Sequence, residues 1–584
     1  MKFSYVAHIL EEINKKSSRI EITKILAQLF HESSLQESQI IAYLVTGSLF
    51  PAYKTLQFHI SHKGVVSLLS FMLDKESSFI EKEFKKYGDF GSLIQQHWQY
   101  KDEGLTVRQV YEALVACAEV SGVGSVEKKQ HELISLLKKV DAISAQYIVK
   151  IVLATLRLGF SDMTIIDSLS WMVVGDKSIR KDIEHAYNIC ADIGLVALTL
   201  KQHGIKGIQD MQIHIGVPIR PAAAERLNSA QEIIEKLGPS IAQPKLDGFR
   251  IQVHIKKMKE HDEIHFFSRN LLDMSDMFPE IKKAIKKLEV KSLICEGEAI
   301  AFDEDTDTFF PFQETVKRKR KHGVEQVSQD LPLRLYVFDI LYLNGHSLLS
   351  KTHHERRDML EKILPQNKES TVQIIDQKLV KNAQELQNYF LKNIEAGLEG
   401  LVVKRDDALY QPGKRNFNWI KLKRHARGKL MDTIDAVILG YYAGKGKRAH
   451  FGVGAFLVGI YNPQKDLLQT IAKIGTGMND EEWKDLKKRC DQLLVESKPL
   501  NVDVPKELYP DVWIDPKIVC TIQSDEITLS PLHTAGKTTT HAGFALRFPR
   551  FISYRFDKST YDVTSIKEIE DLYKLQKIDK KNID

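Results

Sequence analysis

The stretch PKLDGFR, residues 244–250, contains the pattern K-x-D-G-x-R, formed by Lys245, Asp247, Gly248 and Arg250. Four fixed positions would occur by chance roughly 0.004 times in a chain of this length. A lysine that acts as a nucleophile must be neutral, and nearby cations or burial favour the neutral form. Lys245 is therefore the candidate nucleophile of an enzyme that works through a covalent intermediate.

Candidate cations for this lysine lie downstream in NWIKLKR, residues 418–424. Lys421 and Lys423 are two positions apart, and side chains at i and i+2 of a strand point to the same face. We therefore expect both ammonium groups beside Lys245. On the first motif alone, the alternative is a surface lysine in a turn.

The region around this motif mixes strands and helices. In FRIQVHI, residues 249–255, apolar and polar residues alternate, which predicts a half-buried strand. LICEGEAIAF, LRLYVFDILYL and GLVVKR predict further strands, whereas residues 230–237, DMLEKIL and NAQELQNYFLKN predict helices. Pro218 and Pro221 interrupt any helix in GVPIRPAAAER and mark a linker. We expect an α+β domain over residues 211–427.

The sequence on either side of this region has a different character. Residues 1–210 show apolar positions at helical spacing, for example from Ser144 to a predicted helix stop at Gly159. Thr106 and Gln109 form a capping-box pattern. These features predict an all-α domain. Residues 428–584 offer short strands with glycine-rich turns and a final helix near residues 566–576, which predicts a small β-barrel.

Length and composition agree with a large soluble protein. A chain of 584 residues exceeds one domain, and 43% hydrophobic with 27% charged residues is ordinary globular composition. The 83 basic and 77 acidic residues give +6, which permits nucleic acid without requiring it. Five scattered cysteines disfavour a disulfide framework or a four-cysteine zinc site. Without a signal-peptide pattern or an apolar run of roughly 18 residues, we expect a cytoplasmic protein that does not associate with membranes.

PKLDGFR is the first of seven motifs that resemble, in the same order, those of ATP-dependent DNA ligases of the archaeal and eukaryotic replicative type. These enzymes belong to the covalent nucleotidyltransferase superfamily. The other six are FSRN with Arg269, CEGEAIAFD with Glu298, VFDILYLNG with Phe338, EGLVVK with Glu399 and Lys404, GKRNFNWIKLK with Arg415, Lys421 and Lys423, and RFPRFISYRFDK with Arg550, Arg555, Asp557 and Lys558. LRLG and GVPIRPAAAERL are also similar to segments of this family, so the resemblance covers nearly the whole chain.

The resemblance implies three domains and a three-step reaction. The domains are a helical DNA-binding domain at residues 1–210, an adenylation domain at 211–427 and an OB-fold at 428–584. Lys245 would attack the α-phosphate of ATP, expel pyrophosphate and form a lysyl-AMP. AMP would then pass to the 5′-phosphate at a nick in duplex DNA, and the 3′-hydroxyl would displace it. Such sealing serves replication, repair and recombination.

The resemblance also assigns roles to individual side chains. Those around the nucleotide are Arg250 and Glu298 at the ribose, Phe338 on the adenine, Lys421 and Lys423 at the α-phosphate, and Arg269 and Arg415 in the pocket wall. Glu298 and Glu399 are the expected ligands of Mg²⁺, for which Mn²⁺ is a substitute. Arg550 and Lys558 would touch the pyrophosphate during lysine adenylation.

Two positions depart from the family's pattern. Gln243 stands where a glutamate usually reads the adenine amino group. Its amide oxygen can accept from that amine, but its NH₂ group can also donate. The sequence therefore leaves open whether ATP alone is used, or also ADP, GTP or NAD. Glu296 stands where aspartate is usual, and the ribose contact is assigned to Glu298.

The implied partner is nicked duplex DNA, held through its phosphates with an affinity that falls with salt. The run KRKRK, residues 317–321, follows FFPFQETV, a segment similar to one near the family's DNA-facing surface. Phosphate contact is the expectation for this run, and a solvated loop is the alternative. We expect a monomer, with a sliding clamp as a further candidate partner.

Three other classes of protein share part of this pattern. A capping guanylyltransferase or an RNA ligase would have K-x-D-G and a barrel, but capping enzymes lack the helical region. An NAD-dependent ligase carries a four-cysteine zinc module that these cysteines do not build. A catalytically silent DNA-binding protein would have no need to retain together the five residues Lys245, Glu298, Glu399, Lys421 and Lys423.

Overall fold

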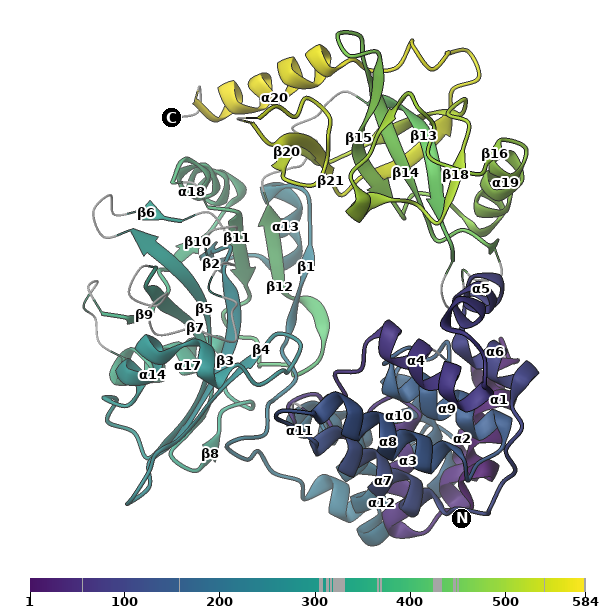
Figure 1. The fold of residues 1–584 in the computed structure, drawn as a ribbon. Coiled ribbons are helices and arrows are strands. Elements are labelled where there is room, and N and C mark those ends of the chain that lie inside the picture. Colours follow the sequence, from purple (N-terminus) through teal and green to yellow (C-terminus); the bar gives the residue numbers. More distant parts are fainter. Residues whose placement is uncertain are drawn as a thin grey trace. The chain divides into compact units, whose positions relative to one another are not determined.

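The structure is a computed structural model, and it describes residues 1–581 except 55, 157, 304–307, 311–314, 316, 317, 319–330, 365, 366, 368, 369, 397, 424–432, 445–447, 449, 450 and 540. The chain divides into two compact units (Figure 1). The first comprises Met1–Asp74 and His97–Arg424, and the second comprises Lys75–Gln96 and His425–Asp584. Across the described residues, no helix is both long and apolar enough to cross a membrane.

The N-terminal region is helical, as the apolar spacing predicts. Its helices are α1 (Phe3–Asn14), α2 (Arg19–Glu32), α3 (Leu35–Leu44), α4 (His62–Leu73), α5 (Ser77–Tyr87), α6 (Phe90–His97), α7 (Val107–Glu119), α8 (Ser125–Leu137), α9 (Ala142–Val152), α10 (Asp162–Val174), α11 (Arg180–Cys190) and α12 (Ile193–Gln209). The capping box predicted from Thr106 and Gln109 is present at the start of α7. The all-α character of this region is confirmed.

Helix α9 ends earlier than its apolar spacing predicts. The expected stop was Gly159, but the last helical residue is Val152. Ala154 has a left-handed backbone with φ 52°, and the N–H of Thr155 donates to the carbonyl of Lys150 at 2.8 Å. This wider turn ends the helix. Leu158 is buried outside any helix, so the apolar positions after α9 reflect burial and not helical periodicity.

The region from residue 223 to 423 is built on two sheets. Their strands are β1 (Ala223–Arg226), β2 (Ser240–Lys245), β3 (Phe249–Lys256), β4 (Glu263–Ser268), β5 (Ser292–Asp303), β6 (Thr308–Phe309), β7 (Leu333–Leu343), β8 (His346–Ser347), β9 (Val372–Ile374), β10 (Lys378–Val380), β11 (Gly400–Lys404) and β12 (Arg415–Lys423). One sheet has the order β1-β12-β11-β2-β10. The other has the order β4-β3-β5-β7-β8, with β6 on β5 and β9 on β7.

Each sheet has helices packed on it and a hydrophobic core of its own. Helices α13 (Ala230–Leu237) and α18 (Ala383–Glu395) pack on the five-stranded sheet, where Ile233 and Leu386 join Leu401 in one cluster. Helices α14 (Pro279–Ile285) and α17 (His353–Ile363) pack on the seven-stranded sheet, where Ile281 and Leu360 lie in the core. Burial of such side chains fixes two separate sheets, and both contribute residues to the site described below.

Strand β3 is not half-buried, which corrects the interpretation of its alternating pattern. Its polar residues Gln252 and His254 are also buried. The predicted linker covers them: Gln252 exchanges hydrogen bonds with the backbone of Ile219 at 2.8 and 2.9 Å, and Gly216 N–H donates to His254 Nδ1 at 3.3 Å. Because the linker backbone satisfies these polar groups, both faces of the strand are buried.

The C-terminal region is strand-rich, as expected of an OB-type barrel. Its strands are β13 (Ile434–Tyr442), β14 (Ala455–Asn462), β15 (Leu467–Ile474), β16 (Leu494–Val495), β17 (Val502–Asp503), β18 (Val512–Ile514), β19 (Val519–Gln523), β20 (Glu526–Ser530), β21 (Gly543–Arg547) and β22 (Arg550–Tyr554). The main sheet has the order β16-β18-β13-β14-β15-β17, and β19 joins β13 to β22. Helices α19 (Asp480–Asp491) and α20 (Ile566–Lys581) add Trp483 and Ile569 to its core. The final helix is confirmed.

Candidate active site

Lys245 is the last residue of β2, and the turn that follows brings it close to β5. Gly248 lies in this turn, where a Cβ atom would stand 2.4 Å from the carbonyl oxygen of Ala299. Only glycine permits so close an approach without displacing the backbone. The N–H of Gly248 donates to Oε1 of Glu298 at 3.2 Å. The glycine of the K-x-D-G motif therefore places the lysine-bearing turn against the carboxylate of the acidic motif.

A pocket of about 1720 Å³ opens at this turn and is lined from both sheets. Nine residues that the sequence predicts for the site line it: Gln243, Lys245, Arg250, Arg269, Glu298, Phe338, Glu399, Lys421 and Lys423. Arg415 is exposed at the start of β12 and is not among the described residues that line the pocket. These nine residues are up to 180 positions apart in the sequence, from Gln243 to Lys423.

A carboxylate flanked by two lysines forms the charged centre of the pocket. Lys245 and Lys423 each form a short ion pair with Glu399, one with each carboxylate oxygen. Burial alone would raise the pKa of Glu399, but the two lysines outweigh it and lower that pKa. Burial and then the charges of Arg415 and Lys423 lower the pKa of Lys421. Both lysines of the NWIKLKR segment reach the pocket, as their i, i+2 spacing predicts.

Glu298 is the second pocket carboxylate and has a different environment. Burial raises its pKa to about 7, against the opposing effects of Lys245, Arg250 and the Gly248 N–H group. In the described part of the chain, no three His, Cys, Asp or Glu side chains form a ready cation cage. Two carboxylates in a pocket that is also lined by lysines suit Mg²⁺, because this ion usually combines one or two carboxylates with substrate phosphates and water.

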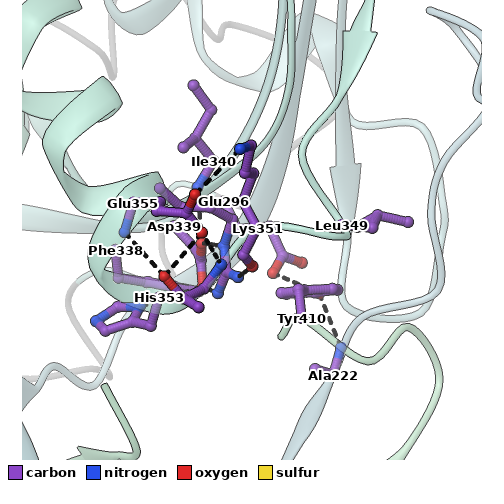
Figure 2. A network of polar contacts seen from close by, with 12 residues as sticks. Ala222, Glu296, Phe338, Asp339, Ile340, Leu349, Lys351, His353, Glu355 and Tyr410 are labelled. Carbon is purple, nitrogen blue, oxygen red and sulfur yellow. Dashed lines mark hydrogen bonds and ion pairs between the residues drawn. The ribbon is translucent and has the colours of Figure 1, made fainter. Parts of the chain in front are cut away.

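Arg250 is anchored by a buried network that the sequence analysis missed. Its guanidinium donates to Oε2 of Glu296 at 3.0 Å and to the Ala222 carbonyl at 2.8 Å. The hydroxyl of Tyr410 donates to the same Glu296 oxygen at 2.8 Å and accepts from Ala222 N–H at 2.9 Å (Figure 2). Glu296 therefore positions Arg250, and Glu298, two residues on, lines the pocket. The only sequence signal for Glu296 was its place in CEGEAIAFD.

A second buried cluster lies beside Phe338. Asp339 accepts two hydrogen bonds from Arg356, at 2.7 and 3.0 Å, and lies 3.9 Å from Lys404 and from His353 (Figure 2). Burial lowers the pKa of Lys404 to about 7, although Asp339 opposes this shift. Lys404 donates to the Phe338 carbonyl at 3.0 Å. The cluster therefore fixes the backbone that presents the pocket-lining ring of Phe338.

The residues of the last motif belong to the second unit. Arg550 pairs with Asp525 at 2.7 Å, and Lys558 pairs with Asp435 at 2.7 Å. Arg555 pairs with the same Asp435 at 2.9 Å. Asp435 keeps a lowered pKa, because Lys558 and Thr521 outweigh the effect of burial. Arg550 and Lys558 are therefore held by carboxylates of their own unit.

The basic run at residues 317–321 is described only at Arg318, and its other four residues lie outside the described part of the chain. The Arg318 side chain is fully buried, forms an ion pair with Glu280 at 2.7 Å and donates to the Met277 carbonyl at 3.2 Å. The prediction of a phosphate contact is wrong for this residue, because its charge is used inside the protein.

The fold and the pocket define an enzyme of the covalent nucleotidyltransferase class. Three family models match the chain in succession: "DNA ligase N terminus" at residues 2–170, "ATP dependent DNA ligase domain" at 221–423 and "ATP dependent DNA ligase C terminal region" at 449–558. A "Probable DNA ligase" of Dictyoglomus turgidum is 42% identical, over 99% of both chains. "DNA ligase 2" of Korarchaeum cryptofilum is 36% identical, over 99% of this chain and 98% of its own.

The chain belongs to the ATP-dependent DNA ligase family, whose function is to seal nicks in DNA. A solved structure described as "Pmar-Lig_Pre" shares the fold, with a TM-score of 0.56 at 15% identity over 94% of this chain and 99% of that one. The rival classes, a capping enzyme, an NAD-dependent ligase and a silent DNA-binding protein, do not fit these matches.

Proposed function

We propose that this ligase seals nicks through a lysyl-AMP formed on Lys245. The observation that supports this most directly is the position of its Nζ atom, in the pocket and in contact with Glu399. The Lys245 ammonium first loses one proton to solvent. A bond then forms between the neutral Nζ and the α-phosphorus of ATP, the bond to the bridging oxygen breaks so that pyrophosphate leaves, and a second proton leaves Nζ. Lys421 and Lys423 offset the negative charge of the phosphate in this step.

The remaining pocket residues would bind and orient the nucleotide. Phe338 would stack on the adenine, and Arg250, held by Glu296, would reach the ribose together with Glu298. Arg269 would contribute a further positive charge to the pocket wall. Arg415 would join it only if the side chain turns inward from its exposed position on β12.

Glu298 and Glu399 would hold Mg²⁺, with Mn²⁺ as a substitute. The ion would there supply neutralising charge to the triphosphate and the leaving pyrophosphate. Because Glu399 is paired with both Lys245 and Lys423, these ion pairs must loosen when the nucleotide and cation enter.

We extend the proposal to the rest of the chain. Residues 1–210 would clamp nicked duplex DNA, residues 211–427 would carry out adenylation, and the barrel of residues 428–584 would bring Arg550 and Lys558 to the pyrophosphate. We propose a monomeric enzyme, with a sliding clamp as a candidate partner.

Nucleotide labelling tests the covalent step. The full-length protein is incubated separately with ATP, GTP and NAD labelled at the phosphorus that would be transferred, and the denatured protein is examined for bound label. Label from ATP, lost when excess chelator is present and restored by Mg²⁺ or Mn²⁺, is the expected result. Label from none of the three nucleotides would contradict covalent catalysis, and label from GTP alone would contradict an adenylation pocket.

Replacing Lys558 should separate the first step of the reaction from the last. Lys558→Ala removes a cation proposed to act only on the leaving pyrophosphate, so self-adenylation should fall by about 10- to 100-fold. Sealing of a nick that already carries AMP should fall much less. The two rates are measured on one preparation by label transfer and by ligation of pre-adenylated DNA.

Lys517 offers a matched control for this variant. It lies in the same unit and also pairs with an aspartate, Asp515, at 2.7 Å, but its side chain is 67% exposed. Lys517→Ala should leave both rates unchanged. Equal losses in both steps for Lys558→Ala would show that this residue does not act on pyrophosphate.

A further inference from the structure

One amide that lines the pocket, that of Gln243, is bonded to a second amide, that of Gln377, to which no role has been assigned. Gln243 lies on β2 two residues before Lys245, is 1% exposed and lines the pocket. Its Nε2 group donates a hydrogen bond to Oε1 of Gln377 at 3.3 Å. Gln377 immediately precedes β10, whose first residue, Lys378, pairs with Ala242 of β2. The sheet register therefore holds the two amides side by side.

This bond fixes what Gln243 can offer to a ligand. A carboxamide has one donor side and one acceptor side, so binding Nε2 to Gln377 leaves the Oε1 atom for the pocket. Among the described residues, the bond to Gln377 is the side-chain hydrogen bond that Gln243 forms. An oxygen acceptor at this place matches the amino group of adenine and repels the carbonyl oxygen that guanine carries at the same ring position.

We propose that Gln377 is a specificity-determining residue, which orients the amide of Gln243 so that the pocket selects ATP over GTP. The inference rests on the proposed function, and it places Gln243 at the purine base because the resemblance puts this residue where the family reads the adenine amino group. Gln377 acts through Gln243 and does not itself touch the nucleotide. If the Gln377 amide rotates, its own NH₂ group faces Gln243, whose amide must then rotate and present a donor to the base. The orientation of Gln377 thus sets the base preference.

Two substitutions at position 377 should change the ratio of ATP to GTP labelling in opposite directions. Gln377→Glu leaves only an acceptor, which holds the donor side of Gln243 and should raise the ratio of ATP to GTP labelling. Gln377→Lys leaves only a donor, which binds the oxygen of Gln243, turns its NH₂ group to the base and should lower that ratio about tenfold. The full-length protein is labelled with each nucleotide, and initial rates are compared. The ratio cancels the effect of the added charge on the triphosphate, which both nucleotides share.

The Gln243→Glu background provides the matched control, because an ionised carboxylate at position 243 only accepts. There, Gln377→Lys should leave the ratio unaltered. An unchanged ratio in the native background, or an equal change in both backgrounds, would overturn the inference. If Gln377→Lys labels with neither nucleotide, the near-isosteric Gln377→Glu variant decides alone. Failure of the unmodified protein to label with ATP would instead refute the proposed function.

Discussion

Lys245→Ala is expected to abolish covalent labelling by ATP, with a loss of at least about 10⁴-fold in the rate of self-adenylation. Alanine has no nucleophilic atom, and the pocket's other lysines serve different purposes. Lys423 is paired with Glu399, and Lys404 is buried and donates to the Phe338 carbonyl. Lys421 lies on β12, which β11 separates from β2. No remaining group can therefore replace the lost Nζ atom, although ATP can still bind.

The same variant should still act on a nick that already carries AMP. In that last step the 3′-hydroxyl attacks the 5′-phosphate and AMP leaves, so no lysine nucleophile is needed. Ligation of pre-adenylated DNA should stay within about tenfold of the unmodified enzyme, because the charges of Lys421 and Lys423 remain. Comparing this rate with ligation in ATP isolates the chemical role of Lys245 from any effect on folding.

Lys256→Ala is a suitable control, since Lys256 is exposed at the end of the neighbouring strand β3. It should label and ligate like the unmodified protein. Persistent label on Lys245→Ala would place the nucleophile elsewhere. Loss of ligation on pre-adenylated DNA as well would show that Lys245 is needed for more than the covalent intermediate.

The sequence predicted those parts of the site that depend on local geometry. Lys245 was identified from the spacing of its motif. The placement of Lys421 and Lys423 on the same face of a strand followed from strand periodicity. A strand was also assumed for Lys421 and Lys423, whereas β2, the strand that ends at Lys245, was not predicted. The predicted features are set by a few neighbouring residues, which a single chain displays directly.

The parts that escaped prediction depend on register and on distant partners. Glu296 meets Arg250 because β3 pairs with β5 in a register that places Arg250 opposite Glu298, and Glu296 lies two residues from Glu298 on the same face of β5. Tyr410, more than a hundred residues later, completes that network. Arg318 belongs to a run of basic residues that was expected to be exposed, yet its side chain is buried and forms an ion pair with Glu280. No local pattern encodes these pairings.

The burial of the linker against β3 is another feature that local sequence patterns could not predict. Alternating polar residues in FRIQVHI correctly indicated a strand, but they could not reveal that the backbone near Ile219 would cover its polar face. A polar side chain is compatible with solvent or with a buried partner, and only the tertiary fold decides between them. Likewise, the hydrogen bond from Gln243 to Gln377 joins residues 134 positions apart.

Replacing Arg356 is expected to have the largest effect on stability. Arg356 and Asp339 are each no more than 2% exposed, and their guanidinium and carboxylate share two hydrogen bonds. Arg356 also donates to the Lys351 carbonyl at 2.6 Å. Burial would raise the pKa of Asp339, but Arg356 and Lys404 outweigh it and lower that pKa to about 2. The carboxylate is therefore ionised and depends on its partners.

Arg356→Met removes the closest of these partners and leaves a buried charge with Lys404 at 3.9 Å as the nearest cation. Breaking a buried pair in this way should lower the free energy of unfolding by about 3–5 kcal/mol. Urea unfolding of the full-length chain measures the loss, in the transition whose midpoint rises when ATP is added. That transition reports on the unit that contains the pocket.

Two further variants decide whether the loss comes from the isolated charge. In Arg356→Met with Asp339→Leu, no buried carboxylate remains, so this double variant should recover much of the stability. Arg405→Met removes an exposed arginine, 4.0 Å from Asp407 in the same unit, and should change the stability by no more than about 0.5 kcal/mol. If the double variant is as unstable as Arg356→Met, packing of the arginine side chain, and not its charge, stabilises this cluster.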